Sequence, residues 1–282
     1  MRALAFLLAL TALPAAAQEM DHSQHGESQA VAGSDAEVGS ETAPPVATDY
    51  AADRVFPADR MEPSRAALLD EGRFNTSTLK IDRLEYRAMD GRDGYAWEAE
   101  AWTGGDIDRF VLATNGEGEF GHKPETFEAS ALWRRAITPY FNLELGARHD
   151  FRPSPQRTYA VAGISGLAPY WIEVQGHLMI SNKGDVHARI EAEHDMRLTQ
   201  KLILQPAVEI NIAMQDVPDL KIGGGVEKIE LGARLRYQVN RKLAPYLGVH
   251  WERKLGGTAD FAQAEGERVS GVSLLFGIRT WF

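Results

Sequence analysis

Two imidazoles, a thioether and a carboxylate fall within six residues near the start of the chain, in the segment Met20-Asp-His-Ser-Gln-His25. The soft sulfur of Met20 suits Cu(I), and the imidazoles of His22 and His25 suit copper in both redox states. A flexible chain can wrap these groups around one ion with little strain, so the spacing favours a weak, exchangeable copper site. The alternative interpretation is a polar linker that contains two histidines by chance.

Further candidate metal ligands are spread along the rest of the chain: His177, His187, Glu191, His250 and Met61. His187 and Glu191 share one face of an expected strand, but four residues of strand separate them by about 13 Å. One strand therefore cannot supply both to a single ion, and neighbouring strands would have to contribute ligands. A solvated or hydrogen-bonded histidine is the alternative at each His position, and Met61 is better explained as a packing residue.

The composition excludes several classes of site. None of the 282 residues is cysteine, which rules out disulfides, thiolate zinc sites and a cysteine nucleophile. The formal charge of −10 argues against a nucleic-acid-binding protein, because such proteins carry a basic surface. A mean hydropathy of −0.30 resembles that of soluble proteins, but a membrane β-barrel alternates apolar and polar residues and also keeps this value low.

Three segments precede any strand pattern. Residues 1–17 combine a positive start, an apolar run and a small-residue cleavage site, which indicates a secretory signal peptide. Residues 18–62 contain almost no large aliphatic side chains, so we expect a disordered periplasmic tail. Residues 63–77 are expected to form a short helix and linker, with Pro63 at the start of the helix and Gly72 near its end.

From residue 78 to the end, apolar and polar residues alternate with the period of a β-strand, as Ile172 and Val174 do with Glu173 and Gln175. Twelve strands are expected, over residues 78–89, 94–104, 106–116, 125–137, 139–151, 156–168, 169–182, 185–197, 200–214, 225–239, 242–256 and 267–282. Most are longer than the strands of soluble sandwiches, whereas a tilted membrane strand needs about 9–11 residues. We therefore expect an all-β fold, an antiparallel outer-membrane β-barrel of about 12 strands over residues 78–282.

The expected connections support a barrel with both chain ends on the periplasmic side. Every second connection is short, as at 104–106 and 240–241, whereas those between them include the longer segments 215–225 and 255–267. This alternation and the even number of strands are typical of bacterial outer-membrane barrels, as is the C-terminal aromatic residue Phe282. A secreted β-sandwich or a soluble lipid-binding barrel is the alternative.

Charged residues of both signs are expected on the inner face of this barrel. They should pair across strands and narrow any channel, so we expect a small or occluded pore. The lumen-facing candidates are Glu98, Glu100, Arg134, Arg148, Glu173, His177, His187, Arg189, Glu191, Glu193, Glu209, Asn211, Lys228, Glu230, Arg234, Arg236, His250, Glu252 and Lys254.

Catalysis is not expected. An outer-membrane hydrolase would need a Ser–His pair on the outer face, and no histidine has matching strand parity. The segment Gly163-Ile-Ser-Gly166 is also not the G-x-S-x-G turn that carries a nucleophilic serine.

Motifs along most of the chain resemble the copper resistance protein B outer-membrane family (CopB/PcoB). The matching stretches are Tyr50–Asp53, Leu84–Arg87, Trp97–Trp102, Gly104–Asp106, Gly116–Gly118, Arg148–Phe151, Gly166–Trp171, Arg189–Glu193, Leu202–Pro206, Leu243–Tyr246, Trp251–Arg253, Leu255–Ala259 and Trp281–Phe282. The resemblance implies a copper-responsive barrel in the Gram-negative outer membrane, preceded by a Met/His-rich periplasmic extension that binds copper.

On this extension the resemblance carries over to Met20, His22 and His25. Many relatives have long repeated Met/His tails, whereas this chain has a single cluster. We therefore expect a protein that binds copper ions, as Cu(I) or Cu(II) or both, and takes part in their transport or sequestration at the outer membrane. Its expected partners are copper ions, outer-membrane lipid and periplasmic copper-carrier or oxidase proteins, with no nucleic acid. A closed barrel that only sequesters copper is the alternative.

Overall fold

The computed structural model describes residues 50–72 and 74–282. The expected signal peptide and the copper-ligand cluster of Met20, His22 and His25 lie outside the described residues. In the described part of the chain, no helix is both long enough and apolar enough to cross a membrane.

Two helical elements precede the strands, the 3-10 helix η1 (Ala51–Arg54) and the helix α1 (Ala58–Glu71). Helix α1 begins five residues before the expected start, so Pro63 lies inside it. The earlier residues include good helix formers, and Asp59 complements the positive end of the helix dipole. The N–H of Gly72 donates to the carbonyl of Leu68 at 2.9 Å, which closes the last turn where the sequence places the helix end.

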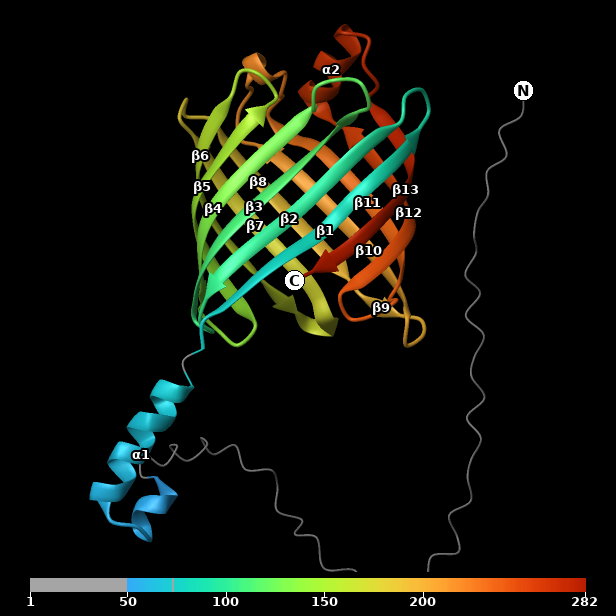
Figure 1. The fold of residues 1–282 in the computed structure, drawn as a ribbon. Helices are drawn as coiled ribbons and strands as arrows, with labels where there is room; N and C mark the ends of the chain where they lie inside the picture. Colours follow the sequence, from blue (N-terminus) through green and yellow to red (C-terminus); the bar gives the residue numbers. More distant parts are fainter. Residues whose placement is uncertain (1–49, 73) are drawn as a thin grey trace, which may run out of the picture. The chain divides into compact units, whose positions relative to one another are not determined.

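The strands form one antiparallel sheet that closes on itself because β1 pairs with the last strand, β13 (Figure 1). Both β8 and β9 pair with β10, so they form one barrel strand, and the described residues build a barrel of twelve strands. The bounds are β1 (Thr76–Met89), β2 (Gly94–Gly104), β3 (Asp108–Glu119), β4 (Thr126–Ala136), β5 (Phe141–Arg152), β6 (Arg157–Ala168), β7 (Ile172–Ser181), β8 (Val186–His194), β9 (Met196–Arg197), β10 (Leu202–Ala213), β11 (Gly225–Tyr237), β12 (Leu243–Lys254) and β13 (Ser270–Trp281).

The expected twelve-stranded barrel is thus confirmed, with local differences in where strands begin. Strand β3 is shifted toward the C-terminus of its expected range. Strand β7 starts only at Ile172, because the preceding residues form the 3-10 turn η2 (Pro169–Trp171). Tyr170 and Trp171 have φ angles of 65° and 63° there, which a strand cannot contain.

The two ends of the barrel differ in the size of their connections. One end, which we call the terminal end, holds the start of β1 and the C-terminus and has mostly short turns (Figure 1). The other end, which we call the α2 end, carries the helix α2 (Gly256–Ala264) and the 3-10 helix η3 (Pro218–Leu220). The expected alternation is therefore present, but the segment 255–267, expected to be a loop, contains a helix.

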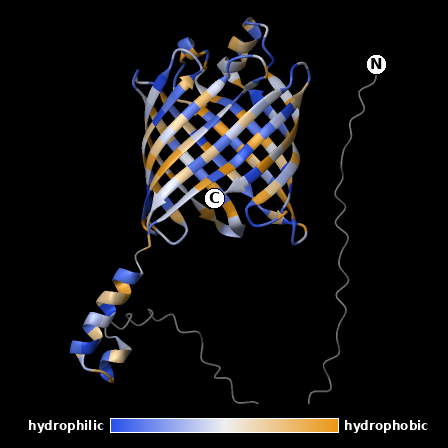
Figure 2. Cartoon of the chain, viewed as in Figure 1, coloured by the Kyte–Doolittle hydropathy of each residue, from blue (hydrophilic) through white to orange (hydrophobic). Residues whose placement is uncertain are grey.

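Outward and inward side chains have opposite character. Large apolar residues such as Leu178, Ile180 and Phe276 point outward and are exposed, which is what a lipid-facing belt requires. The buried side chains include many polar and charged ones, with Glu144 fully buried. Figure 2 shows the resulting alternation of hydrophobic and hydrophilic residues along the strands. The barrel therefore has an apolar outer surface and a charged interior.

Candidate functional site in the barrel lumen

The interior holds a cavity of about 590 Å³ whose lining reaches from one end of the barrel to the other. It includes Tyr140 and Asn142 near the terminal end, and Arg87 and Glu117 near the α2 end. Of the lumen-facing residues expected from the sequence, all but His187, Asn211, Glu252 and Lys254 line this cavity. His187 and Asn211 are instead buried in the inner wall.

Glu144 on β5 is the centre of the first cluster of polar contacts in the lumen. Its carboxylate accepts hydrogen bonds from Arg134 at 2.6 Å and Ser165 at 2.8 Å, and lies 2.6 Å from Nε2 of His177. Arg134 also forms a bidentate contact with Glu100 on β2. A fully buried carboxylate is costly unless it is paired in this way, so these contacts hold the β2–β7 wall together.

Glu128 on β4 forms a second cluster that crosses the lumen. One arginine partner, Arg148 at 2.7 Å, lies on the neighbouring strand β5. The other, Arg189 at 3.0 Å, lies on β8, three strands further on. Because this second contact joins separated parts of the wall, it narrows the lumen at that level. Arg148 is itself held by Asp150 at 2.6 Å.

A third cluster surrounds Glu85 on β1. Its carboxylate accepts hydrogen bonds from Arg234 on β11 at 2.7 Å and from the hydroxyl of Tyr246 on β12 at 3.0 Å. Arg87 joins Glu85 to Glu117 on β3, with a contact of 2.6 Å to Glu117. The cluster ties the closing strands of the barrel to its first strands.

The opposite part of the wall carries four glutamates in direct register. Glu191 on β8 faces Glu209 on β10, Glu209 faces Glu230 on β11, and Glu230 faces Glu252 on β12. We call these four residues the glutamate row. Like charges that face each other across strands are destabilising, so this arrangement carries an electrostatic cost.

The cost is only partly offset by neighbouring hydrogen-bond donors and cations. Glu230 contacts Lys228 at 2.5 Å and His250 at 2.9 Å, and Glu209 contacts Arg189 at 3.4 Å. The outer members, Glu191 and Glu252, have no side-chain hydrogen bond or ion pair with any residue that the structure describes. Glu191, Glu209 and Glu230 line the lumen cavity, so these members of the row present carboxylate oxygens that a mobile cation can contact.

The candidate metal ligands expected from the sequence are not gathered into one site. His177 is bonded to Glu144, His250 is bonded to Glu230, and Glu191 belongs to the glutamate row. His187 packs edge-on against another ring, and Met61 lies on α1. Within residues 50–72 and 74–282, no three or more His, Cys, Asp or Glu residues are arranged to hold a metal ion.

Several central charged residues were missing from the sequence-based set. Glu128 and Glu144 have the same strand parity as Arg134 and Arg148, so the period of two already contained the signal for them. Glu85 was hidden by an irregularity in β1 between Ile81 and Arg83, where the strand register shifts and the inward parity changes.

Comparisons with known proteins identify a family for this chain. Residues 75–282 match the family model described as Copper resistance protein B precursor (CopB). The chain is 42% identical over 202 residues to Copper resistance protein B of Escherichia coli, covering 72% of this chain and 68% of that protein. It is 36% identical over 271 residues to the Copper resistance protein B homolog of Pseudomonas syringae pv. tomato, covering 96% and 90%.

Similar solved structures include the NanC porin, with 12% identity, a TM-score of 0.48 and coverage of 72% of this chain and 98% of that one. The KdgM porin has 10% identity and a TM-score of 0.43, with coverage of 73% and 99%. The family match and the closed barrel with its apolar belt assign the protein to the outer membrane. The chain belongs to the copper resistance protein B family.

Proposed function

We propose that the protein binds copper ions in the lumen of its barrel and passes them across the outer membrane. The observation that carries this proposal is the glutamate row, in which carboxylates face one another without a full set of cationic partners. Such an arrangement costs stability in an empty protein, and a passing cation would relieve that cost. Membership of a copper-resistance family supports copper as the cation.

The row also has the properties that ion movement requires. Rings and rows of carboxylates attract cations, and conduction needs several weak sites in succession rather than one tight site. Adjacent strands lie about 4.8 Å apart, so neighbouring members of the row stand within one short step of each other. An ion held loosely by Glu191 and Glu209 could therefore move to Glu230 and Glu252 without losing all its ligands.

The ion pairs that cross the lumen set the size limit of this passage. The contacts of Glu128 with Arg189 and of Glu117 with Lys228, the latter at 3.9 Å, join strands on separate parts of the wall. They would exclude large solutes while leaving room for an ion beside the row. The same contacts favour one alternative, a closed barrel that sequesters copper without passing it. A stable current in planar lipid bilayers would exclude that alternative.

The N-terminal segment completes the proposal. Met20, His22 and His25 offer soft and borderline ligands on a segment expected to lie in the periplasm. They would exchange copper, as Cu(I) or Cu(II), between the barrel and periplasmic copper-carrier or oxidase proteins. The protein would have no catalytic role, and copper would be its cargo.

A strain that lacks the protein tests this function. We expect it to grow less well in copper-containing medium, and to regain tolerance when the wild-type chain is restored. The double variant Glu191→Gln/Glu252→Gln should restore little tolerance, whereas Glu265→Gln, which removes a carboxylate in an outer loop, should restore it fully. Unchanged tolerance and unchanged cell-associated copper on deletion would contradict the proposal.

A further inference from the structure

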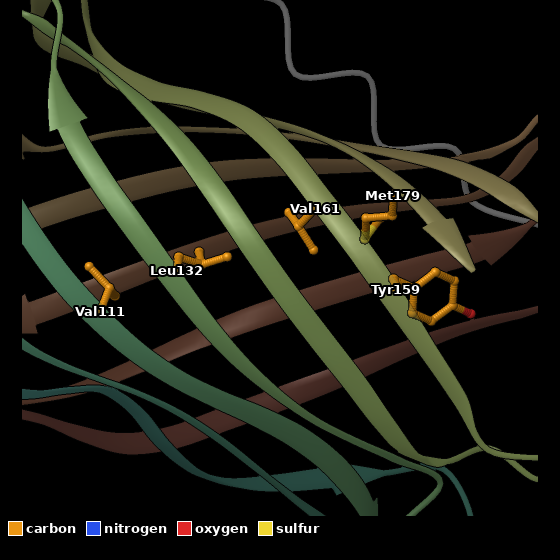
Figure 3. Close-up of a cluster of buried hydrophobic side chains, with 5 residues drawn as sticks. All are labelled: Val111, Leu132, Tyr159, Val161 and Met179. Atoms are coloured by element: carbon orange, nitrogen blue, oxygen red, sulfur yellow. The ribbon is translucent and has the colours of Figure 1, made fainter. Parts of the chain in front are cut away.

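An uncharged row crosses the otherwise charged inner wall. Successive cross-strand partners on β2, β3 and β4 are Trp102, Val111 and Leu132. Beyond Gly146 on β5, the same line continues through Val161 on β6 and Met179 on β7 to His187 on β8. Figure 3 shows Val111, Leu132, Val161 and Met179 of this line in a buried apolar cluster that also contains Tyr159. Because the strands are tilted, the row ends near the α2 end of the barrel, one residue inside the start of β8.

The histidine at the end of this row lacks the partner that the other lumen histidines have. His177 and His250 each have a carboxylate within hydrogen-bond distance of Nε2. His187 is only 6% exposed, and its Nε2 is buried with no hydrogen-bond partner among the described residues. Its ring stands edge-on to the ring of Tyr159, with 5.8 Å between the ring centroids. A buried, unpaired ring nitrogen is costly, so Nε2 of His187 is free to bind a ligand that enters the wall.

Met179 on β7 is the cross-strand neighbour of His187. Met179 and His187 are direct cross-strand partners, and both side chains point into the barrel, so their Cβ atoms are neighbours. Met179 is buried, and its sulfur has one polar contact, a weak hydrogen bond from Nη1 of Arg148 at 3.2 Å. Arg148 has stronger partners in Glu128 and Asp150, so it does not depend on this sulfur.

We propose that Met179 and His187 form a Cu(I) site in the inner wall near the α2 end of the barrel. A thioether sulfur and a neutral imidazole nitrogen are soft and borderline donors, which together favour Cu(I) over the harder divalent ions. The row beside them supplies apolar neighbours, and a monovalent ion adds the smallest charge to a region rich in paired arginines. This site rests on the proposed function, because copper is the cargo that would reach it.

Competition with a colorimetric Cu(I) chelator under anaerobic conditions measures this site in the detergent-solubilised full chain. The background is Met20→Leu/His22→Asn/His25→Asn, which removes the expected ligands of the N-terminal segment. We expect the background to bind one Cu(I) and X-ray absorption to show a sulfur neighbour. Adding Met179→Leu or His187→Asn should weaken binding by about tenfold or more. Adding Met179→Leu should also remove the sulfur neighbour.

Matched controls separate ligand loss from general damage. Met196→Leu changes an exposed methionine and His149→Asn a half-buried histidine that contacts Thr158, and both should leave the affinity unchanged. Heat-modifiable migration in gels verifies that each variant barrel is folded, and Met179→Leu keeps the side-chain volume nearly constant.

Unchanged affinity in both ligand variants, or bound copper without a sulfur neighbour, would overturn the site. If these binding results excluded the Cu(I) site but copper tolerance still depended on Glu191 and Glu252, the proposed function would stand and only the site would be withdrawn. If copper tolerance also did not depend on the protein, both the Cu(I) site and the proposed function would be contradicted.

Discussion

The two sides of the barrel interior treat carboxylates in opposite ways. On the side built by β2–β6, which we call the paired wall, Glu100, Glu128, Glu144 and Asp150 each contact an arginine at 2.6–2.8 Å. On the side built by β8–β12, the glutamate row places four carboxylates face to face, and its outer members have no cationic partner at such distances among the described residues. Carboxylates therefore hold neighbouring strands together on one side of the lumen and offer oxygen ligands on the other.

The difference shows how a charged lumen can be stable and still bind ions. Carboxylates that are fully paired lower the energy of the wall and are unavailable to a moving ion. Carboxylates in register raise the energy of the empty protein and become favourable when a cation arrives. Removing a carboxylate should consequently have opposite effects on stability in the two regions.

The largest effect is expected for Glu144→Ala on the paired wall. This change leaves Arg134 and His177 without their shared buried partner, and breaking such a pair costs about 3–5 kcal/mol. Unfolding in detergent, followed by heat-modifiable gel migration, measures it. The matched variant Glu100→Ala should cost less, because Arg134 keeps its contact with Glu144. If the two variants lost the same free energy of unfolding, buried and partly exposed ion pairs would contribute equally to stability, contrary to this account.

A second large effect is expected for Glu128→Ala, which removes the contact to Arg189 across the lumen. The passage should widen, so single-channel conductance in planar bilayers should rise severalfold. Asp108→Ala disrupts the exposed pair with Arg135 outside the lumen and serves as the control. If the conductance were the same in both variants, the crossing pair would not limit the passage.

A smaller effect of opposite sign is expected in the glutamate row. Glu191→Gln removes one of two facing negative charges and should stabilise the barrel by about 0.5 kcal/mol. The midpoint of unfolding in detergent measures this gain. A loss of stability instead would show that Glu191 is held by contacts like those of the paired wall, and the comparison would fail.

The smallest effect concerns Asp185 in the turn between β7 and β8. Burial acts to raise its pKa, but hydrogen bonds from Arg157 and Ser181 outweigh burial, so the pKa lies below the ordinary value. The stabilisation is therefore complete above the unfolded pKa, and is lost as the pH falls through the lower folded value, below about pH 4. Melting temperatures between pH 7 and pH 2.5 should fall more for the wild type than for Asp185→Asn. Equal falls would show that other carboxylates set the acid limit.

Much of the fold follows from the alternation of residue types. The period of two, the even number of strands and the alternation of short and long connections predicted the barrel, and β2 has the expected bounds. The sequence could not reveal where the period breaks in the first strand. The irregularity in β1 near Asp82 changes which parity faces inward, and only the pairing of strands shows it.

The candidate site was less predictable, for a related reason. Each member of the glutamate row could be assigned to the lumen from its own strand, but their alignment depends on the register between strands. That register is set by turns and irregularities, not by the residues of the row. For the same reason, His187 was expected to be a candidate ligand, while its neighbour Met179 was not.

Copper flux into proteoliposomes tests the role of the glutamate row most directly. Vesicles with the wild-type protein and with Glu265→Gln should take up copper at the same rate along a copper gradient. The double variant Glu191→Gln/Glu252→Gln should take it up severalfold more slowly, although its barrel is folded and at least as stable. Equal copper flux through the wild type and the double variant would contradict the assignment of the row as the ion path.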